Sequence, residues 1–181
     1  MSTATKLQYA EWLTDADLVA VLAALGAGAR IVGGAVRNHL MGEPVADIDI
    51  ACAETPEKSQ ALLEAKGIRV VPTGIQHGTI TAVMPTRQFE ITTLRVDVKT
   101  DGRHADVAFT GDWTEDAKRR DFTVNALYAD ADGTVHDPLG TGLDDLTARR
   151  IRFIGDAATR IREDYLRVLR FFRFHAWYGK G

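Results

Sequence analysis

The sequence predicts an α/β (α+β) fold, in which a mixed sheet is flanked by helices and followed by a helical segment. Three observations support this prediction. Up to about residue 150, short segments with the polar–apolar alternation of strands are interspersed with segments of helical periodicity. Glycine- and proline-containing turns separate these segments. After Gly155 the pattern changes to a helical repeat that has no internal Gly or Pro.

The first quarter of the chain predicts four elements. Apolar residues recur at helical spacing over residues 7–26, and glycines end that helix. Residues 30–33 form a short strand that leads into the turn Gly33–Gly34, and a short helix follows over 35–41. Residues 47–52 alternate between polar and apolar, which indicates a half-buried strand.

The middle of the chain predicts a helix, a hairpin and a loop. Thr55, a capping residue followed by proline, begins a helix over 56–66. The β-rich segments 79–84 and 89–94 are separated by a turn and predict a hairpin. Residues 99–112 are polar and contain glycine, so we expect a mobile loop there.

The last third predicts two helices around a short β segment. A helix is expected over 113–120, followed by the apolar stretch 122–128. The turn 130–133 precedes another short strand. A continuous helix is expected over 156–178, and it either packs on the preceding module or begins a helical domain.

Composition and charge bound the class of protein. The chain has 181 residues, 45% hydrophobic and 26% charged, with a net charge of −3, as in a soluble globular protein. No segment is apolar enough to span a membrane, and the polar N-terminus does not resemble a secretory signal. The single cysteine, Cys52, cannot form an internal disulfide and fits a reducing compartment. We therefore expect a cytoplasmic protein.

Basic residues concentrate near the C-terminus. Between Arg149 and Arg173 there are eight arginines and three acidic residues. Such a segment can present a basic face to a polyanion although the whole chain is mildly acidic. A solvated arginine-rich helix is the alternative interpretation.

Gly33–Gly34 is the first candidate for ligand binding. A glycine turn between a strand and a helix lets backbone N–H groups approach a phosphate, and the helix N-terminus favours negative charge. Arg37 can reach the same phosphate with a planar fork of donors. Such turns also occur without any ligand, so this signal alone is weak.

Asp47 and Asp49 form the second candidate. Side chains two apart on a strand share a face, so both carboxylates converge while Ile48 and Ile50 point into the core. A hard divalent cation, Mg²⁺, is the natural counter-charge for such a pair and can also bind triphosphate oxygens. Glu90 is the candidate third carboxylate. Solvated strand carboxylates are the alternative for all three.

Three segments together resemble a known family. Residues 31–38 (IVGGAVRN) with Asp47–Ile48–Asp49, residues 119–126 (RRDFTVNA) and residues 163–170 (EDYLRVLR) are similar, in order, to motifs of class II CCA-adding enzymes and bacterial poly(A) polymerases. Both are polymerase-β-like nucleotidyltransferases. Residues 100–105, Asp112–Trp113 and residues 169–174 resemble the CCA-adding branch more than the poly(A) branch.

The resemblance implies roles for the matching positions. It implies magnesium at Asp47 and Asp49, with Glu90 as the accessory catalytic carboxylate. It implies that the incoming CTP or ATP is bound by Gly33, Gly34, Arg37, Arg120, Asp121, Asn125, Asp164, Arg167, Arg170 and Arg173. It further implies that the segment from Arg95 through the polar loop adjusts between CTP and ATP.

Base selection has an independent chemical rationale. A carboxylate accepts from the amino group of cytosine or adenine, and an arginine donates to a ring nitrogen or carbonyl. Uracil and guanine present the opposite pattern and leave buried groups unpaired. Asp164 and Arg167 are three residues apart, so on a helix they can share a face. An ordinary salt bridge within that helix is the alternative.

The sequence therefore predicts three parts: an N-terminal helix over 1–26, a nucleotidyltransferase head over 27–150, and the truncated start of a helical neck over 151–181. The expected reaction adds CMP and AMP to the 3′ end of a tRNA. A poly(A) polymerase and a non-catalytic nucleotide- or tRNA-binding fragment are the alternatives. A dinucleotide-binding unit fits less well because the third glycine of its motif is missing.

Overall fold

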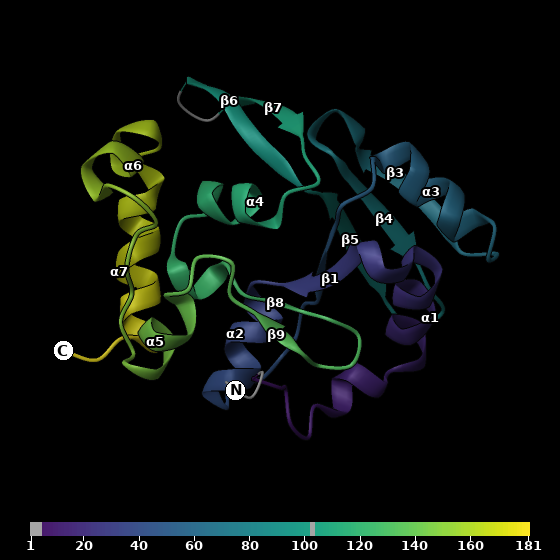
Figure 1. Cartoon of the computed structure of the whole chain (residues 1–181), viewed down its shortest axis with the longest axis horizontal. Helices are drawn as coiled ribbons and strands as arrows, with labels where there is room; N and C mark the ends of the chain where they lie inside the picture. The colour runs from purple at the N-terminus through teal and green to yellow at the C-terminus, as the bar shows by residue number, and fades with distance from the viewer. Residues whose placement is uncertain (1–4, 102–103) are drawn as a thin grey trace.

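The fold is built on a seven-stranded mixed sheet, seen in a computed structural model that describes residues 5–101 and 104–181 (Figure 1). Its strand order is β3-β4-β5-β2-β1-β8-β9, and β2 and β5 are a parallel pair while the other neighbours are antiparallel. A separate two-stranded ribbon, β6-β7, stands beside it. The strands are β1 (Ala29–Val32), β2 (Asp49–Cys52), β3 (Arg69–Gly74), β4 (Thr79–Val83), β5 (Gln88–Thr93), β6 (Arg95–Asp101), β7 (His104–Phe109), β8 (Tyr128–Ala129) and β9 (Val135–His136).

Helices surround this sheet. In Figure 1, α1 and α3 lie on one side of the molecule, and α5, α6 and α7 lie on the other. The α-helices are α1 (Ala16–Leu25), α2 (Gly34–Met41), α3 (Pro56–Glu64), α4 (Trp113–Arg119), α5 (Gly142–Thr147), α6 (Ala157–Glu163) and α7 (Leu166–Tyr178). Short 3-10 turns are η1 (Glu11–Thr14), η2 (Gly26–Gly28), η3 (Ile75–His77) and η4 (Thr123–Asn125). None of the helices within the described ranges is long and apolar enough to cross a bilayer.

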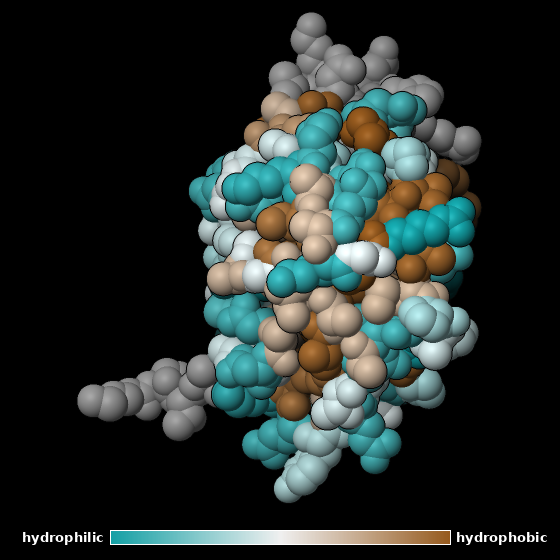
Figure 2. Space-filling view, turned by 90° about the vertical axis from the view of Figure 1, so that its right-hand side faces the viewer, coloured by the Kyte–Doolittle hydropathy of each residue, from teal (hydrophilic) through white to brown (hydrophobic). Residues whose placement is uncertain are grey.

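The core forms where the inward faces of the central strands meet the helices. Ile31, Ile50, Ile80 and Ile91 of four neighbouring strands are all fully buried. Aromatic side chains of α7, Phe171 among them, pack against the same core, which joins the C-terminal helix to the sheet. Hydrophobic patches on the face turned to the viewer in Figure 2 are separated by hydrophilic side chains.

The predicted helix over 7–26 is wrong in its first half. Leu7 donates its backbone N–H to Gly133, so the chain begins as an extended partner of the β8-β9 turn. The α-helix starts only at Ala16, because the Asp15 side chain accepts from the backbone N–H groups of Asp17 and Leu18 and caps it. The predicted start of the helix after Thr55 is confirmed, since Thr55 accepts from the N–H of Lys58.

The loop predicted over 99–112 is also wrong. Most of it belongs to the β6-β7 ribbon, in which Arg95 pairs with Phe109 and Asp101 with His104; Gly102 and Arg103 lie outside the described residues. Backbone hydrogen bonds between strands do not depend on side-chain polarity, so a polar sequence can form such a ribbon. Strand β3 at the sheet edge has a largely exposed burial pattern and was not predicted.

The continuous helix predicted over 156–178 is interrupted. Asp164 has an extended backbone (φ −154°, ψ 107°) and separates α6 from α7. Its carboxylate accepts from the N–H of Leu166 at 3.0 Å. A side chain that satisfies a free backbone donor favours a new helix start at that point, even without Gly or Pro.

Candidate active site

One cavity of about 940 Å³ brings together twelve of the thirteen predicted site residues. Its walls come from the β1–α2 turn, the start of β2, the end of α4 with η4, and the α6–α7 junction, and none of the lining residues belongs to α1 or α3. The predicted residues on its wall are Gly33, Gly34, Arg37, Asp47, Asp49, Arg120, Asp121, Asn125, Asp164, Arg167, Arg170 and Arg173. Segments that lie far apart in the sequence thus form a single polar site.

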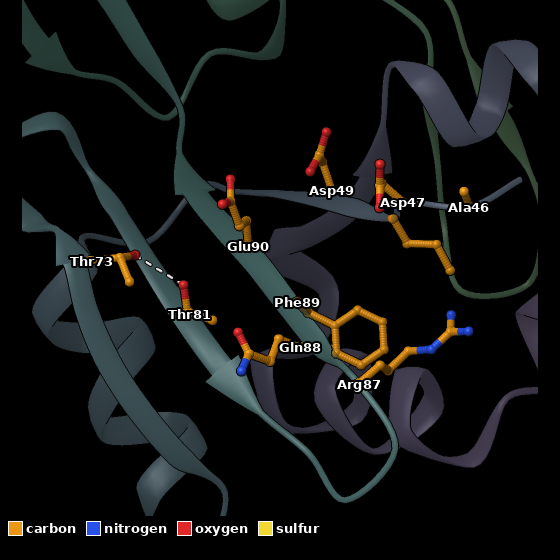
Figure 3. Close-up of a pocket in the computed structure, with 10 residues that line it drawn as sticks. Ala46, Asp47, Asp49, Thr73, Thr81, Arg87, Gln88, Phe89 and Glu90 are labelled. Atoms are coloured by element: carbon orange, nitrogen blue, oxygen red, sulfur yellow. Dashed lines mark hydrogen bonds between the residues drawn. The ribbon is translucent and has the colours of Figure 1, made fainter.

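Glu90 lines an adjoining cavity. Asp47 and Asp49 line both cavities. The adjoining cavity, about 640 Å³ in volume, is lined by Asp47, Asp49 and Glu90 together with neighbouring polar residues. Figure 3 shows the three carboxylates projecting from the same face of the sheet. The parallel register of β2 and β5, with Ile50 opposite Ile91, places Glu90 beside Asp49. The sequence alone could not show that these strands are neighbours.

The glycine turn has the backbone geometry expected of a phosphate loop. Gly33 has a positive φ of 68°, which favours glycine, and a Cβ atom there would lie 3.5 Å from the carbonyl oxygen of Asn125. Its own carbonyl accepts from the N–H of Arg37 as the first turn of α2 forms. The N-terminus of this helix, which begins at Gly34, therefore opens into the cavity.

The carboxylates carry a charge that the protein does not fully compensate. Desolvation by the surrounding chain, followed by the negative charge of Glu90, raises the pKa of Asp49 above its usual range, while Arg120 opposes the shift and Asp47 adds to it. Asp47 lies before the strand and not within it, and both aspartates are exposed. A divalent cation fits this excess of negative charge.

A site with two carboxylates fits magnesium, which rarely takes all of its ligands from the protein. Within the described part of the chain, no three His, Cys, Asp or Glu side chains are grouped tightly enough to hold a metal ion. Magnesium is usually bound by one or two carboxylates, with water and substrate phosphates completing its coordination. Asp47 and Asp49 match that pattern. Glu90 forms no three-residue metal-binding group with them.

The raised pKa of Asp49 leads to a stability prediction. A carboxyl group whose pKa is higher in the folded state destabilises the fold above that pKa, and the penalty disappears below the unfolded value near ~3.9. We expect Asp49→Asn to raise the Tm of the metal-free protein at pH 7 by no more than about 2 °C, because the carboxylate is exposed and solvent screens its charge, and by less as the pH falls toward 4. Thermal unfolding in EDTA measures this change.

In magnesium, the wild type should become more stable than Asp49→Asn. Saturating Mg²⁺ should raise the Tm of the wild type and leave Asp49→Asn nearly unchanged, because binding to the folded state alone stabilises it. An equal rise in both proteins would show that the ion binds elsewhere.

Arg37 lies in the cavity but is already held by the protein. Its guanidinium donates to the side chains of Asn38 and Asn125 and to the Tyr178 hydroxyl, and its carbon Cζ lies 4.5 Å from the centre of the Tyr178 ring. Burial lowers the pKa of Arg37 from its ordinary value. A residue of α7 thus helps to fix the orientation of an arginine on α2.

Asp121 links the segment that follows α4 to α7. Its carboxylate accepts from Asn125 at 3.0 Å and from Arg170 at 2.6 Å. Burial alone would raise the pKa of Asp121, but the hydrogen bonds from Asn125 and Arg170 outweigh it and hold that pKa below its usual range. The carboxylate therefore stays ionised as the partner of Arg170.

Asp164 and Arg167 line the same cavity without pairing with each other. Arg167 forms an ion pair with Glu163 and donates to the carbonyl of Arg160 at 2.7 Å. Asp164 stands at the break between two helices, so the expected placement of both on one helix is wrong. The salt bridge considered between them is not formed either, and the Asp164 carboxylate accepts instead from the N–H of Leu166.

Three further residues line the cavity: Arg95, Arg119 and Phe174. Arg95 begins β6 and donates to the carbonyl of His77. Arg119 precedes Arg120 in the predicted motif, and Phe174 follows Arg173. Their position next to predicted site residues is the sequence signal that could have identified these two residues. Asp116, which holds Arg119 and Arg120, carried no signal of its own in the sequence.

The fold agrees with the result of a family comparison. Residues 29–152 match the model of the poly(A) polymerase head domain, and the chain belongs to this family. The class inferred from the three motifs is thereby confirmed.

Individual relatives are more specific. Over 81% of its length the chain is 51% identical to CCA tRNA nucleotidyltransferase 1, mitochondrial, of Danio rerio. Its fold is similar to that of a Bacillus stearothermophilus CCA-adding enzyme in complex with CTP (TM-score 0.77, 37% identity, 88% of this chain). It is also similar to a tRNA nucleotidyltransferase complexed with a primer tRNA and an incoming ATP analog (TM-score 0.65, 31% identity, 81% of this chain). The chain spans 34%, 38% and 41% of these three proteins, respectively.

Proposed function

We propose that this chain carries the nucleotide- and metal-binding part of a magnesium-dependent, template-independent nucleotidyltransferase that adds CMP and AMP to the 3′ end of tRNA. The observation that carries the proposal is the single cavity in which Asp47 and Asp49 face a cluster of arginines. Carboxylates that bind a divalent cation, next to cations that bind phosphates, are what phosphoryl transfer requires.

In the proposed reaction the 3′ hydroxyl of the RNA attacks the α-phosphate of CTP or ATP. The bond between the 3′ oxygen and the α-phosphorus forms as the bond from the α-phosphorus to the β-phosphate oxygen breaks, pyrophosphate leaves, and the proton of the hydroxyl passes to solvent. Asp47 and Asp49 would hold magnesium, which would neutralise charge on the phosphates and lower the pKa of the attacking hydroxyl. Glu90, beside Asp49, serves as the accessory carboxylate.

The remaining residues bind and select the nucleotide. The N–H groups at Gly33 and Gly34 and the guanidiniums of Arg37 and Arg120 bind the triphosphate. Asp121 and Asn125 position the ribose and phosphates, and Arg170 and Arg173 complete the site. Asp164 and Arg167 hydrogen-bond the Watson–Crick edge of the incoming base, which rejects uracil and guanine.

We also propose the division of the chain into three parts that the sequence suggested. We assign residues 1–26 to an N-terminal segment, 27–150 to the nucleotidyltransferase head and 151–181 to the start of a helical neck. The tRNA substrate is supported by the relative described as complexed with a primer tRNA and an ATP analog. A reducing compartment is supported by the single, free and buried Cys52, and cytoplasm is our proposal for it.

Nucleotide incorporation tests the proposal. A tRNA that lacks its 3′-terminal CCA is incubated with the chain, Mg²⁺ and labelled CTP, ATP or both, and the products are resolved at single-nucleotide length. We expect two C additions with CTP and a terminal A that depends on prior CTP. A long A tract made from ATP alone would instead indicate a poly(A) polymerase, and nucleotide binding without product would indicate a non-catalytic module.

A further inference from the structure

A buried carboxylate lies directly behind the arginines of the cavity. Asp116 of α4 does not line the cavity, and only 1% of its side chain is exposed. Five hydrogen bonds converge on it. They come from the backbone N–H of Arg95 (3.3 Å), Arg119 Nε (2.9 Å), Arg120 Nε (3.2 Å) and Nη2 (3.0 Å), and the Tyr128 hydroxyl (2.8 Å).

These contacts use one edge of the Arg120 guanidinium and leave the other edge for a ligand. Nε and Nη2 are both held by Asp116 Oδ2. Nη1 points toward the glycine turn, since a Cβ atom built on Gly33 would lie 3.9 Å from it. A planar fork fixed at one edge presents its remaining donor in one direction, which here is the proposed triphosphate position.

The same carboxylate holds two other segments of the site. Asp116 Oδ1 accepts from Arg119 Nε, and the Arg119 side chain also lines the cavity. Oδ1 accepts in addition from the N–H of Arg95, the first residue of β6. Asp116 therefore connects the base of the β6-β7 ribbon with two arginines that reach the cavity.

The electrostatics keep this carboxylate ionised. Burial alone would raise the pKa of Asp116, but Arg120 and Arg119 outweigh the effect and hold that pKa below its usual range. The pKa of Arg120 is raised despite its own burial. Removing one partner from a buried ion pair leaves the other uncompensated, so the orientation of both arginines depends on Asp116.

We propose that Asp116 is a positioning residue for the nucleotide site, which fixes Arg120 and Arg119 so that they meet the triphosphate. The proposal rests on the proposed function, because it requires a nucleoside triphosphate in this cavity. Asp116 itself touches no substrate and acts through the arginines.

A double-mutant cycle of Asp116→Asn and Arg120→Ala tests this role. The Kd for MgCTP is measured by titration calorimetry, and kcat and KM for CTP are measured with the tRNA acceptor. We expect each single variant to lose about 100-fold in kcat/KM, because misplaced phosphate donors no longer meet the substrate. The double variant should lose at least about tenfold less than the product of the single losses, because both act on one interaction.

Asp145→Asn is the matched control. Asp145 is also a fully buried aspartate with arginine partners, Arg150 and Arg152, but none of the three lines the cavity. We expect this variant to lower the Tm and leave the Kd for MgCTP within about twofold of the wild type. An equal loss of CTP binding in Asp145→Asn would show that any buried aspartate has this effect and would overturn the proposal.

Arg120→Lys gives a second test if Asp116→Asn does not fold. A lysine keeps the charge but has no fork to engage Asp116 and a phosphate together, so CTP binding should fall as in Arg120→Ala. Wild-type binding by Arg120→Lys, or additive losses in the cycle, would overturn the positioning role while the proposed function stands. A wild-type chain that binds no MgCTP would overturn the proposed function and this inference with it.

Discussion

Replacing Asp49 by asparagine is expected to lower nucleotide transfer to the tRNA 3′ end by about a thousandfold or more, because the charge stabilisation of the transferring phosphoryl group is lost. Asparagine keeps the shape of the side chain but removes the charge that balances a divalent cation. Single-turnover incorporation of CMP in saturating Mg²⁺ measures the effect. Excess EDTA should abolish transfer by the wild type in the same assay.

Glu90→Gln should lower nucleotide transfer less than Asp49→Asn does. Glu90 stands beside Asp49 on the neighbouring strand but belongs to no three-residue metal cluster in the described part of the chain. We expect a loss of about tenfold, as for a group that supports bound ligands without carrying them. Equal transfer by the wild type and Asp49→Asn would refute the metal assignment, and equal losses at Asp49 and Glu90 would place both in direct contact with the metal.

Asparagine at position 164 is expected to relax base selection. Asp164 can only accept a hydrogen bond, which suits the amino groups of cytosine and adenine. An asparagine amide can also donate, and can therefore meet the carbonyl of uracil. We expect the ratio of kcat/KM for CTP over UTP to fall by about 10- to 100-fold, since a good base contact contributes about 1–3 kcal/mol of discrimination. Competition between labelled CTP and UTP measures it.

Asp156→Asn is the control for this variant. Asp156 caps α6 by accepting from the N–H of Thr159 at 2.9 Å, much as Asp164 accepts from Leu166 at the start of α7. It does not line the cavity. Its replacement should leave the CTP-to-UTP ratio unchanged. The same ratio in the wild type and Asp164→Asn would show that another group reads the base.

The α6–α7 segment contacts the site in more ways than the proposed base reading requires. Arg170 holds Asp121 and Tyr178 contacts Arg37, so α7 orients one residue just before η4 and one on α2. Arg160 donates to the backbone carbonyl of Arg120 at 2.9 Å. A shift of α7 would therefore change the geometry of the phosphate-binding groups as well as that of the base reader.

Local chemistry made much of the fold predictable. Glycine at position 33 is required by its positive φ, Thr55 and Pro56 begin α3, and the alternation around Ile50 marks β2. Each of these signals acts within a few residues. The elements that were missed depend on distant partners: Leu7 leaves the helical pattern to bond Gly133 in the β8-β9 turn, and most of the described part of the polar segment 99–112 belongs to the strand pair β6-β7.

The same distinction between local signals and distant partners applies to the candidate site. The sequence by itself determined the chemical groups, because the glycine turn, the paired aspartates and the arginine motifs are short segments whose residue types suit phosphate, metal and base binding. Tertiary structure alone decided which groups meet: the parallel pairing of β2 with β5 puts Glu90 beside Asp49, and Asp164, at the break between α6 and α7, lines the same cavity as Asp49. It also revealed Asp116, whose role comes from burial behind two arginines and not from any local pattern. Burial and electrostatic pairing between distant segments are properties of the packed chain, which the order of residues encodes but does not display.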